Sequence, residues 1–140
     1  MSIMTPTLYI IRGLPGAGKS TFAKKMLETG MADAHFEADM FFEKDGKYQF
    51  DPNKLNAAHM WCRNNVEKAL HEGKNVVVSN TFTKHSEMYP YIHFCKSNGY
   101  HYKVIRLETN YGSIHNVPPE AIARMNARFQ DYPGESVING

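Results

Sequence analysis

Residues 13–21 read Gly-Leu-Pro-Gly-Ala-Gly-Lys-Ser-Thr and match the pattern G-x-x-x-x-G-K-[ST] at every defined position. Glycines in such a loop let consecutive backbone N–H groups curl around an anion without a Cβ in the way. A helix that begins directly after the loop points the positive end of its dipole at the same anion. The segment is therefore predicted to hold a polyphosphate, provided that a strand precedes it and a helix follows it.

The flanking sequence supplies both elements. Residues 7–11 form an apolar, β-branched run typical of a buried strand, and apolar residues recur at helical spacing over residues 21–27. We therefore interpret the segment as a P-loop for ATP and not as a chance glycine-rich turn. Lys19 is expected to reach the β- and γ-phosphates as a catalytic residue, and the Ser20 hydroxyl to ligate Mg²⁺. The predicted nucleotide-binding residues are Gly13, Pro15, Gly16, Ala17, Gly18, Lys19, Ser20 and Thr21.

Length and composition indicate one compact domain with a substantial core, since the chain has 140 residues of which 42% are hydrophobic. We find neither an apolar stretch of transmembrane length nor the basic and apolar regions of a signal peptide. Cys62 and Cys95 lack metal-binding spacing and are expected to be buried thiols in a reducing compartment. The sequence thus predicts a cytoplasmic protein without a membrane partner, and the net charge of +2 permits a nucleotide or nucleic acid without requiring either.

Strands are expected to alternate with helices along the chain, which predicts an α/β fold with a parallel sheet flanked by helices, that is, a three-layer P-loop NTPase fold. The domain is expected over residues 1–132, with a loose C-terminal tail at 133–140. The expected strands lie at about 7–11, 35–38, 75–79 and 102–107, and the expected helices at about 21–27, 53–71, 86–97 and 118–129.

Ligands of such sheets bind beyond the carboxyl ends of the strands, so the segments that follow the strands are expected to converge. Asp39 follows the second strand and is predicted to be catalytic. A carboxylate within hydrogen-bond reach of an acceptor hydroxyl orients that hydroxyl and takes its proton. The alternative is that Asp39 caps the segment after it.

Ser79-Asn80-Thr81 follows the third strand, where many P-loop proteins carry an acidic residue for Mg²⁺. The segment contains no acid. Thr81 is therefore predicted to act with Ser20 at the metal, and Thr81 or Asn80 to hold a metal-bound water. The alternative for Asn80 is ordinary polar turn chemistry.

Arginines are expected where charge develops during phosphoryl transfer. Arg124 and Arg128 lie four residues apart on the last helix, away from its apolar stripe, and are predicted to be catalytic. The alternative is a solvated helix face, because Glu120 stands four residues before Arg124. Arg12 and Arg63 are further options for this role.

Two other groups of side chains are interpreted as structural. His59 falls on the apolar stripe of the second long helix, which favours a hydrogen-bonded, partly buried histidine over a catalytic one. Aromatic side chains around the turn before that helix favour local packing over stacking on bases. They are Phe41, Phe42, Tyr48 and Phe50.

Several further segments recur in this order with the P-loop in one group of proteins. They are Asp39-Met40-Phe41-Phe42, Tyr48-Gln49-Phe50-Asp51-Pro52, Ala58-His59, Asn80-Thr81, His115-Asn116-Val117-Pro118 and Ile122-Ala123-Arg124-Met125. On these residues the chain, from about 8 to 129, resembles the small P-loop kinases related to the 5′-hydroxyl polynucleotide kinase domain. The resemblance implies a phosphotransferase with a lid over the nucleotide. It also implies that Lys19 and Ser20, with Thr21, bind ATP and Mg²⁺ and that Asp39 is the base.

Three positions depart from the pattern of that family. Phe42 stands where the phage polynucleotide kinase has an arginine that helps hold the acceptor phosphate, and Gly112 aligns with the lid arginine. Ser79-Asn80 replaces the acidic residue after the third strand, and the lid stretch 109–116 is short. These departures leave three readings open. The first is a kinase for a hydroxyl, with a single-stranded polynucleotide 5′ end as one acceptor. The others are a kinase for a nucleoside, sugar or antibiotic, and an ATP-binding module with little catalysis.

Overall fold

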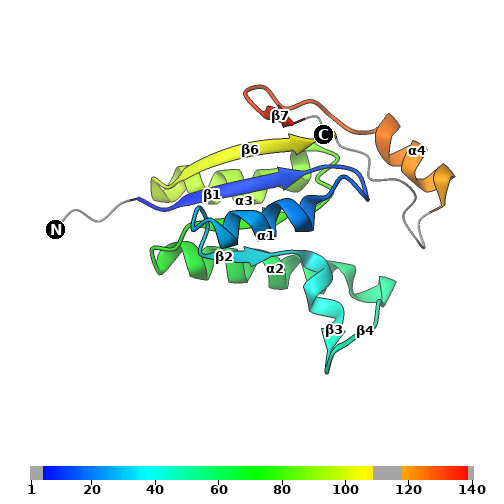
Figure 1. Cartoon of the computed structure of the whole chain (residues 1–140), viewed down its shortest axis with the longest axis horizontal. Coiled ribbons are helices and arrows are strands. Elements are labelled where there is room, and N and C mark those ends of the chain that lie inside the picture. The colour runs from blue at the N-terminus through cyan, green and yellow to red at the C-terminus, as the bar shows by residue number, and fades with distance from the viewer. Residues whose placement is uncertain (1–4, 109–117, 139–140) are drawn as a thin grey trace.

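The core of the protein is a five-stranded parallel sheet, seen in a computed structural model that describes residues 5–108 and 118–138 (Figure 1). The strand order is β2-β5-β1-β6-β7 and every pairing is parallel. This confirms the predicted α/β class with a parallel sheet. The strands are β1 (Thr7–Arg12), β2 (Ala34–Phe36), β5 (Val76–Ser79), β6 (His101–Leu107) and β7 (Ser136–Ile138).

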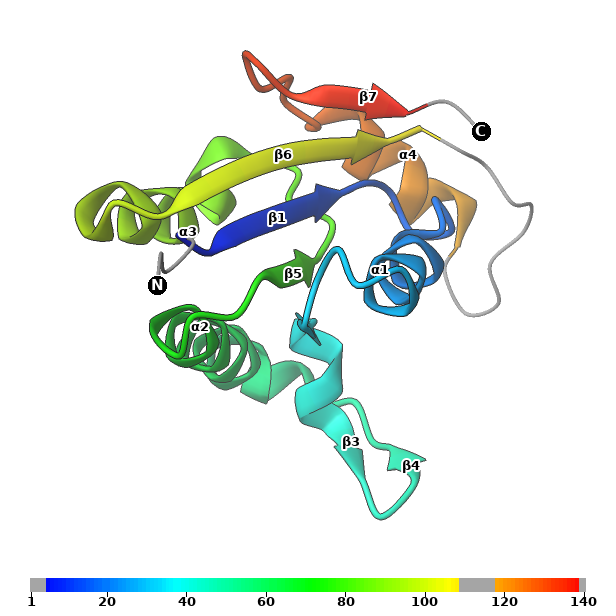
Figure 2. The same ribbon diagram turned by 60° about the vertical axis from the view of Figure 1, so that its left-hand side comes forward.

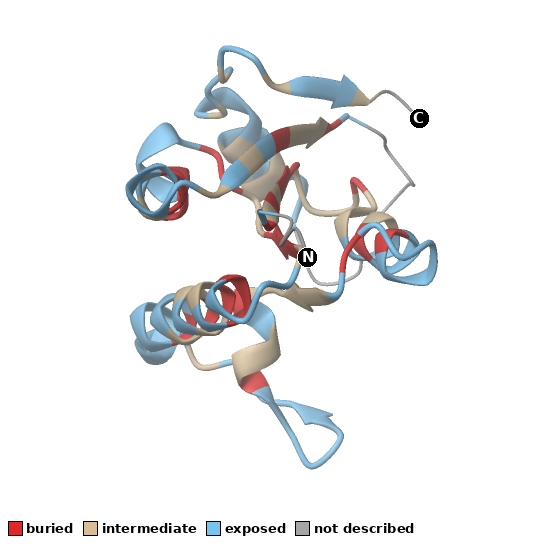
Figure 3. Cartoon of the chain, turned by 90° about the vertical axis from the view of Figure 1, so that its left-hand side faces the viewer, coloured by how far each residue is buried: buried red, intermediate tan, exposed pale blue. Residues whose placement is uncertain are grey.

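Helices cover both faces of the sheet, which gives the three expected layers (Figures 2 and 3). Side chains alternate along each strand, so neighbouring residues enter different halves of the core. On one face Leu8, Ile10 and Val78 pack with α2 (Leu55–His71) and α3 (His85–Asn98). On the other face Ile11 and Val77 pack with α1 (Lys19–Glu28). Val76, Val77 and Val78 are fully buried, which confirms that β5 is covered on both faces.

The segment between β2 and α2, where the sequence shows turn signals, forms a small hairpin that projects from the body (Figure 2). It consists of the 3-10 helix η1 (Ala38–Phe42), the strands β3 (Glu43–Lys44) and β4 (Lys47–Tyr48), and the short helix η2 (Pro52–Lys54). Asp51 caps η2 by accepting a hydrogen bond from the Asn53 amide at 2.9 Å. The Phe42 ring packs edge-on against Tyr48 and Phe50, as the local-packing interpretation expects, while Tyr48 and Phe50 stay about half exposed.

The expectation of a loose tail is wrong for Ser136–Ile138, which forms β7 at the edge of the sheet beside β6. The strand has only three residues, and only Ile138 is partly buried. So short a segment shows no alternation of apolar and polar residues from which a strand could be predicted. Its pairing includes the Glu108 amide, which donates to the Ile138 carbonyl at 2.9 Å. Within the described residues, no helix is both long and apolar enough to span a bilayer.

A buried ion pair attaches the C-terminal segment to the strand that feeds the P-loop. The Arg12 side chain is fully buried, and its Nη1 lies 2.9 Å from Oε1 of Glu135, whose side chain is 6% exposed. Arg12 also donates to the Phe82 carbonyl from Nε at 3.0 Å and from Nη2 at 2.7 Å. The guanidinium carbons of Arg12 and Arg106 lie over the Phe129 ring, 4.3 and 4.4 Å from its centroid. These contacts join both ends of the chain and the segment after β5.

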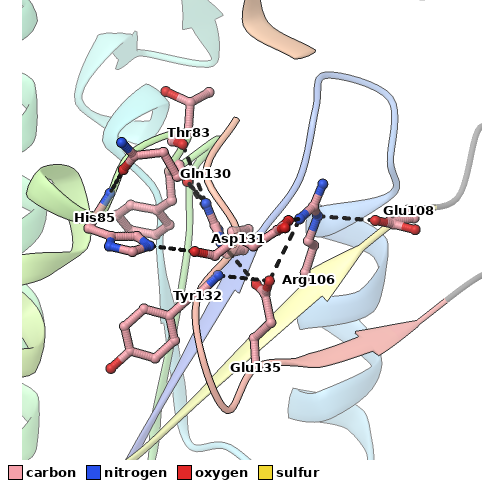
Figure 4. A network of polar contacts seen from close by, with 10 residues as sticks. Thr83, His85, Arg106, Glu108, Gln130, Asp131, Tyr132 and Glu135 are labelled. Carbon is pink, nitrogen blue, oxygen red and sulfur yellow. Dashed lines mark hydrogen bonds and ion pairs between the residues drawn. The ribbon is translucent and has the colours of Figure 1, made fainter. Parts of the chain in front are cut away.

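Residues 130–135 add a second set of polar contacts around this pair (Figure 4). The Gln130 amide donates to the Thr83 carbonyl at 2.7 Å, and the Gln130 side chain accepts from the His85 amide at 2.8 Å. Asp131 pairs with Arg106. The C-terminal segment is therefore fastened both to the sheet edge and to the start of α3.

Glu135→Gln is expected to lower the free energy of unfolding by about 2–3 kcal/mol, because it removes the charge that offsets the buried Arg12 guanidinium. Urea denaturation followed by circular dichroism measures this change. Glu108→Gln is the matched control, since that carboxylate pairs with Arg106 at 3.2 Å but is 41% exposed, and we expect less than about 1 kcal/mol. Equal losses in both variants would contradict a special role for the buried pair.

Candidate functional site

The loop between β1 and α1 has the backbone geometry of a phosphate cradle. Gly16 and Gly18 have φ values of 86° and 85°, in the left-handed region that favours glycine. A Cβ on Gly13 would lie 2.9 Å from the Leu107 carbonyl oxygen and 3.0 Å from the Cβ of Ala17, so this position also requires glycine. Gly13 and Ala17 are buried behind the loop, whereas Lys19 begins α1 and faces the cleft.

Lys19 lies folded against its own loop. Its Nζ donates to the carbonyl oxygens of Gly13 at 2.9 Å and Leu14 at 3.0 Å. Burial lowers the pKa of Lys19 to about 8, although the charges of Glu37 and Asp39 act in the opposite direction. The ammonium group is thus mostly charged at neutral pH, and a polyphosphate would add negative charge that favours this form.

A cleft of ≈540 Å³ opens above the P-loop at the carboxyl end of the sheet. The P-loop contributes Pro15, Gly16, Gly18, Lys19, Ser20 and Thr21 to its lining. Asp39 and Glu37 line the cleft from the end of β2, and Thr81 lines it from the segment after β5. The structure thereby brings Lys19, Ser20, Asp39 and Thr81 together, as expected for segments that follow parallel strands. The catalytic and metal-binding roles of these residues stay predictions.

Asp39 is exposed and lies in the first turn of η1. Its Oδ1 accepts a hydrogen bond from the Tyr48 hydroxyl at 3.3 Å. The N-cap of η1 is Glu37 and not Asp39, so the capping alternative for Asp39 is wrong. An exposed carboxylate beside the P-loop is free to accept a proton from a hydroxyl that enters the cleft.

Glu37 is a site residue that sequence reasoning missed. Its Oε1 accepts a hydrogen bond from the Ser20 hydroxyl at 2.7 Å, and it also lies within the charge field of Lys19. Burial raises the pKa of Glu37, and the hydrogen bond from Ser20 opposes that shift. The only sequence signal is its place at the end of β2, two residues before Asp39. Glu37 thus brings a carboxylate to the cleft, whereas Ser79-Asn80-Thr81 contains none.

His35 and Ser79 form a neutral pair beneath the cleft. The His35 Nε2 lies 2.7 Å from the Ser79 hydroxyl oxygen, and burial lowers the pKa of His35 to about 4. The imidazole is therefore uncharged at neutral pH, and its 3.5 Å contact with Glu37 is not an ion pair there. Since Ser79 is fully buried and engaged with His35, we do not expect it at a metal ion.

The segment that carries Thr81 is tied to both neighbouring strand ends. The Gly13 amide donates to the Thr81 carbonyl at 3.3 Å, and the Asn80 side-chain oxygen accepts from the Ala38 amide at 3.1 Å. Phe82 has a φ of 48°, which is costly for a residue with a Cβ, and its carbonyl is held by Arg12. Arg12 thus holds the turn that presents Thr81 to the cleft, which places this arginine in the supporting structure and not at the ligand.

The arginines of the last helix do not reach the cleft in this structure. Arg124 and Arg128 are exposed on or at the end of α4 (Pro119–Ala127), and the residue of α4 that lines the cleft is Met125. That Arg124 and Arg128 stabilise the charge that develops during phosphoryl transfer stays a prediction. Gly112 and the rest of the expected lid at 109–116 lie outside the described residues.

Comparison with known proteins agrees with this geometry. Residues 8–132 match the family described as AAA domain (AAA_33). Human (Homo sapiens) NEDD4-binding protein 2 is 31% identical over 143 residues, a match that covers 94% of this chain and 8% of that protein. The chain therefore spans a small part of the length of this curated relative.

Two solved structures share the fold. A chain of the Pnkp1/Rnl/Hen1 RNA repair complex superposes with a TM-score of 0.71 at 19% identity, covering 91% of this chain and 45% of that one. The APS kinase CysC of Mycobacterium tuberculosis, in complex with AMPPNP and APS, gives a TM-score of 0.64 at 14% identity. That match covers 96% of this chain and 88% of the kinase. At these identities the likeness shows a common fold.

Proposed function

The chain belongs to the AAA domain family AAA_33 and has the fold of the P-loop kinases, and on this basis we propose that it transfers the γ-phosphate of ATP to a hydroxyl group. One observation carries the proposal: Lys19, Ser20 and Asp39 line a single cleft. Such a cleft combines a polyphosphate cradle with a carboxylate that can act on an acceptor, which are the parts that phosphoryl transfer needs.

Each residue has a defined task in the proposed reaction. The P-loop amides and Lys19 hold the β- and γ-phosphates and offset their charge. Asp39 orients the acceptor hydroxyl and takes its proton. The acceptor oxygen forms a bond to the γ-phosphorus, the bond from that phosphorus to the bridging oxygen breaks, and ADP leaves with the bonding electrons.

The residues around Ser20 fit a magnesium ion. A hydroxyl and a carboxylate lie 2.7 Å apart at Ser20 and Glu37, and Mg²⁺ prefers such oxygen ligands together with phosphate oxygens and water. Ser20 and Glu37 would hold the ion, directly or through water, and Thr81 lines the same cleft. When bound, Mg²⁺ neutralises charge on the transferred phosphate.

Glu37→Gln is expected to weaken the Mg²⁺-dependent part of ATP binding by about 10–100-fold, because an amide is a poorer partner for a metal than a carboxylate. Calorimetric titration with ATP, with and without Mg²⁺, measures this without relying on turnover. Since burial raises the pKa of Glu37, the Mg²⁺-dependent gain in wild type is expected to fall as the pH is lowered through that pKa. Glu28→Gln, an exposed carboxylate at the end of α1, is the control. An unchanged Mg²⁺ dependence in Glu37→Gln would remove Glu37 from the metal site.

For the acceptor we propose a single-stranded polynucleotide 5′-hydroxyl as the first candidate, since a structural neighbour belongs to an RNA repair complex. A small hydroxyl compound is the second candidate. It is favoured by Phe42, which stands where the resemblance places an acceptor-binding arginine and is only 3% exposed within the hairpin.

The acceptor is tested with γ-labelled ATP, Mg²⁺ and a panel that contains a 5′-hydroxyl oligonucleotide, nucleosides and neutral and acidic sugars. We expect label to move from ATP to at least one hydroxyl compound, and the preferred compound separates the two candidates. ATP binding without any labelled acceptor would contradict the proposed transfer and favour an ATP-binding module.

A further inference from the structure

A second cavity of ≈600 Å³ adjoins the P-loop cleft. The two share three wall residues, which are His59, Asn80 and Thr81. Helix α2, the segment after β5 and helix α3 form the walls of the second cavity. The second cavity therefore borders the cleft that contains Lys19 and Asp39 along these three residues.

One face of α2 lines the second cavity and borders the P-loop cleft at His59. Asn56, His59, Met60 and Arg63 all line the second cavity and follow one another at positions i, i+3, i+4 and i+7. Arg63 lies four residues after His59, or about 6 Å further along the helix axis. His59 is exposed and not partly buried as expected, since its side chain lies between the two cavities.

The guanidinium group of Arg63 is held only weakly by acidic side chains of the described residues, so it is available to bind an anionic ligand. Among the described residues its ion pair is with Glu67 on the same helix, at 3.8 Å, and both side chains are about one-third exposed. Such a pair adds little in water. Glu87, the carboxylate in the cavity wall, is already engaged, because it accepts hydrogen bonds from the Thr83 amide and hydroxyl, both at 3.1 Å. The guanidinium of Arg63 is thus the group in this wall that best suits an anion.

The remaining wall mixes polar and apolar side chains. Its apolar part is Met60, which is 54% exposed, together with Pro90 and the nearly buried rings of Phe82 and Tyr91, whose centroids lie 5.7 Å apart. Burial raises the pKa of the Tyr91 hydroxyl well above its usual range, and this hydroxyl bonds to the Cys62 thiol. The tyrosine therefore contributes a neutral, apolar surface and no anionic charge to the cavity.

We propose that this cavity is the acceptor subsite and that Arg63 selects hydroxyl compounds carrying an anionic oxygen group, phosphate or carboxylate, about one helical turn from the reacting hydroxyl. This inference rests on the proposed kinase function. It gives the chain an acceptor-binding arginine on α2, in place of the arginine that is missing at Phe42. Met60, the exposed apolar side chain of this wall, would contact the body of the acceptor between its two polar ends.

The test is calorimetric binding to protein saturated with Mg²⁺ and a non-hydrolysable ATP analogue. Two matched pairs of probes are used: thymidine 3′-monophosphate against thymidine, and gluconate against glucose. We expect at least one anionic probe to bind wild type about 10-fold or more tighter than its neutral partner. Arg63→Gln removes that preference, Arg63→Lys retains part of it, and Lys68→Gln, an exposed charge on the same helix, leaves it unchanged. The probe pair that responds identifies phosphate or carboxylate as the anion.

The proposal is overturned if anionic and neutral probes bind equally, if no probe binds, or if Arg63→Gln keeps the preference. Phosphoryl transfer is measured on the same proteins, so that the two proposals can fail separately. Arg63-dependent anion binding without transfer to any probe would contradict the kinase function and leave the anion subsite standing. Transfer whose KM does not depend on the acceptor charge or on Arg63 would contradict the subsite alone.

Discussion

Replacing Lys19 with alanine is expected to reduce phosphoryl transfer by about 10³-fold or more, with ATP binding also weakened. The Nζ group lies at the mouth of the P-loop, where it bonds to the Gly13 and Leu14 carbonyls. Alanine removes the cation that would offset the charge of the transferred phosphate. Lys24→Ala, an exposed lysine of α1, is the matched control and should retain wild-type rates. Full transfer activity in Lys19→Ala would contradict the assigned site.

The same lysine makes the wild-type protein sensitive to alkaline pH. Because burial lowers the pKa of Lys19 to about 8, the free protein loses this charge as the pH rises through 8, where an ordinary lysine is still fully charged. ATP binds the charged form, so its affinity is expected to be full below pH 8 and to decline between pH 8 and 10. Calorimetric titrations across this range measure the decline. An affinity that stays constant to pH 10 would contradict the combination of a lowered Lys19 pKa and a contact between Lys19 and the phosphates.

Replacing Asp39 with asparagine is expected to lower the rate of transfer by about 10²–10⁴-fold while ATP still binds. Asparagine has the same shape and keeps an oxygen for the Tyr48 hydroxyl, but it cannot take the proton of the acceptor. Loss of this carboxylate also removes a charge that raises the pKa of Lys19, so the assay belongs at or below pH 7. Asp45→Asn at the tip of the hairpin is the control. Transfer at the wild-type rate in Asp39→Asn would exclude Asp39 as the base.

The sequence predicted the parts of the site that depend on local patterns. The P-loop is contiguous, and its glycines, lysine and serine carry their geometry within nine residues. The sequence predicts Asp39 and Thr81 because each follows an expected strand, and parallel strands bring their carboxyl ends together. The same alternation of strands and helices predicted the order of layers.

Features that depend on contacts between distant side chains could not be predicted in this way. Glu37 is recognised as a site residue by its place in the cleft wall and by its hydrogen bond from the Ser20 hydroxyl, 17 positions earlier in the chain. Glu135, the residue before the edge strand β7, pairs with Arg12 across 123 positions. Contacts between residues so far apart in the chain leave no trace in the periodic patterns by which helices and strands are predicted. Arg12 was a candidate for the reacting phosphate, and only its full burial against the Phe82 carbonyl identifies it as a supporting residue.

The most direct test of the central claim compares wild type, Lys19→Ala and Asp39→Asn in one experiment. Each protein is incubated at pH 7 with γ-labelled ATP, Mg²⁺ and a 5′-hydroxyl oligonucleotide or the best compound of the acceptor panel. Acceptor-bound label and ATP affinity are measured on the same samples. We predict labelled acceptor with wild type alone, and ATP affinity close to wild type in Asp39→Asn but reduced in Lys19→Ala. Wild-type protein that binds ATP and labels no acceptor, or an Asp39→Asn variant that labels it as fast as wild type, would contradict this account.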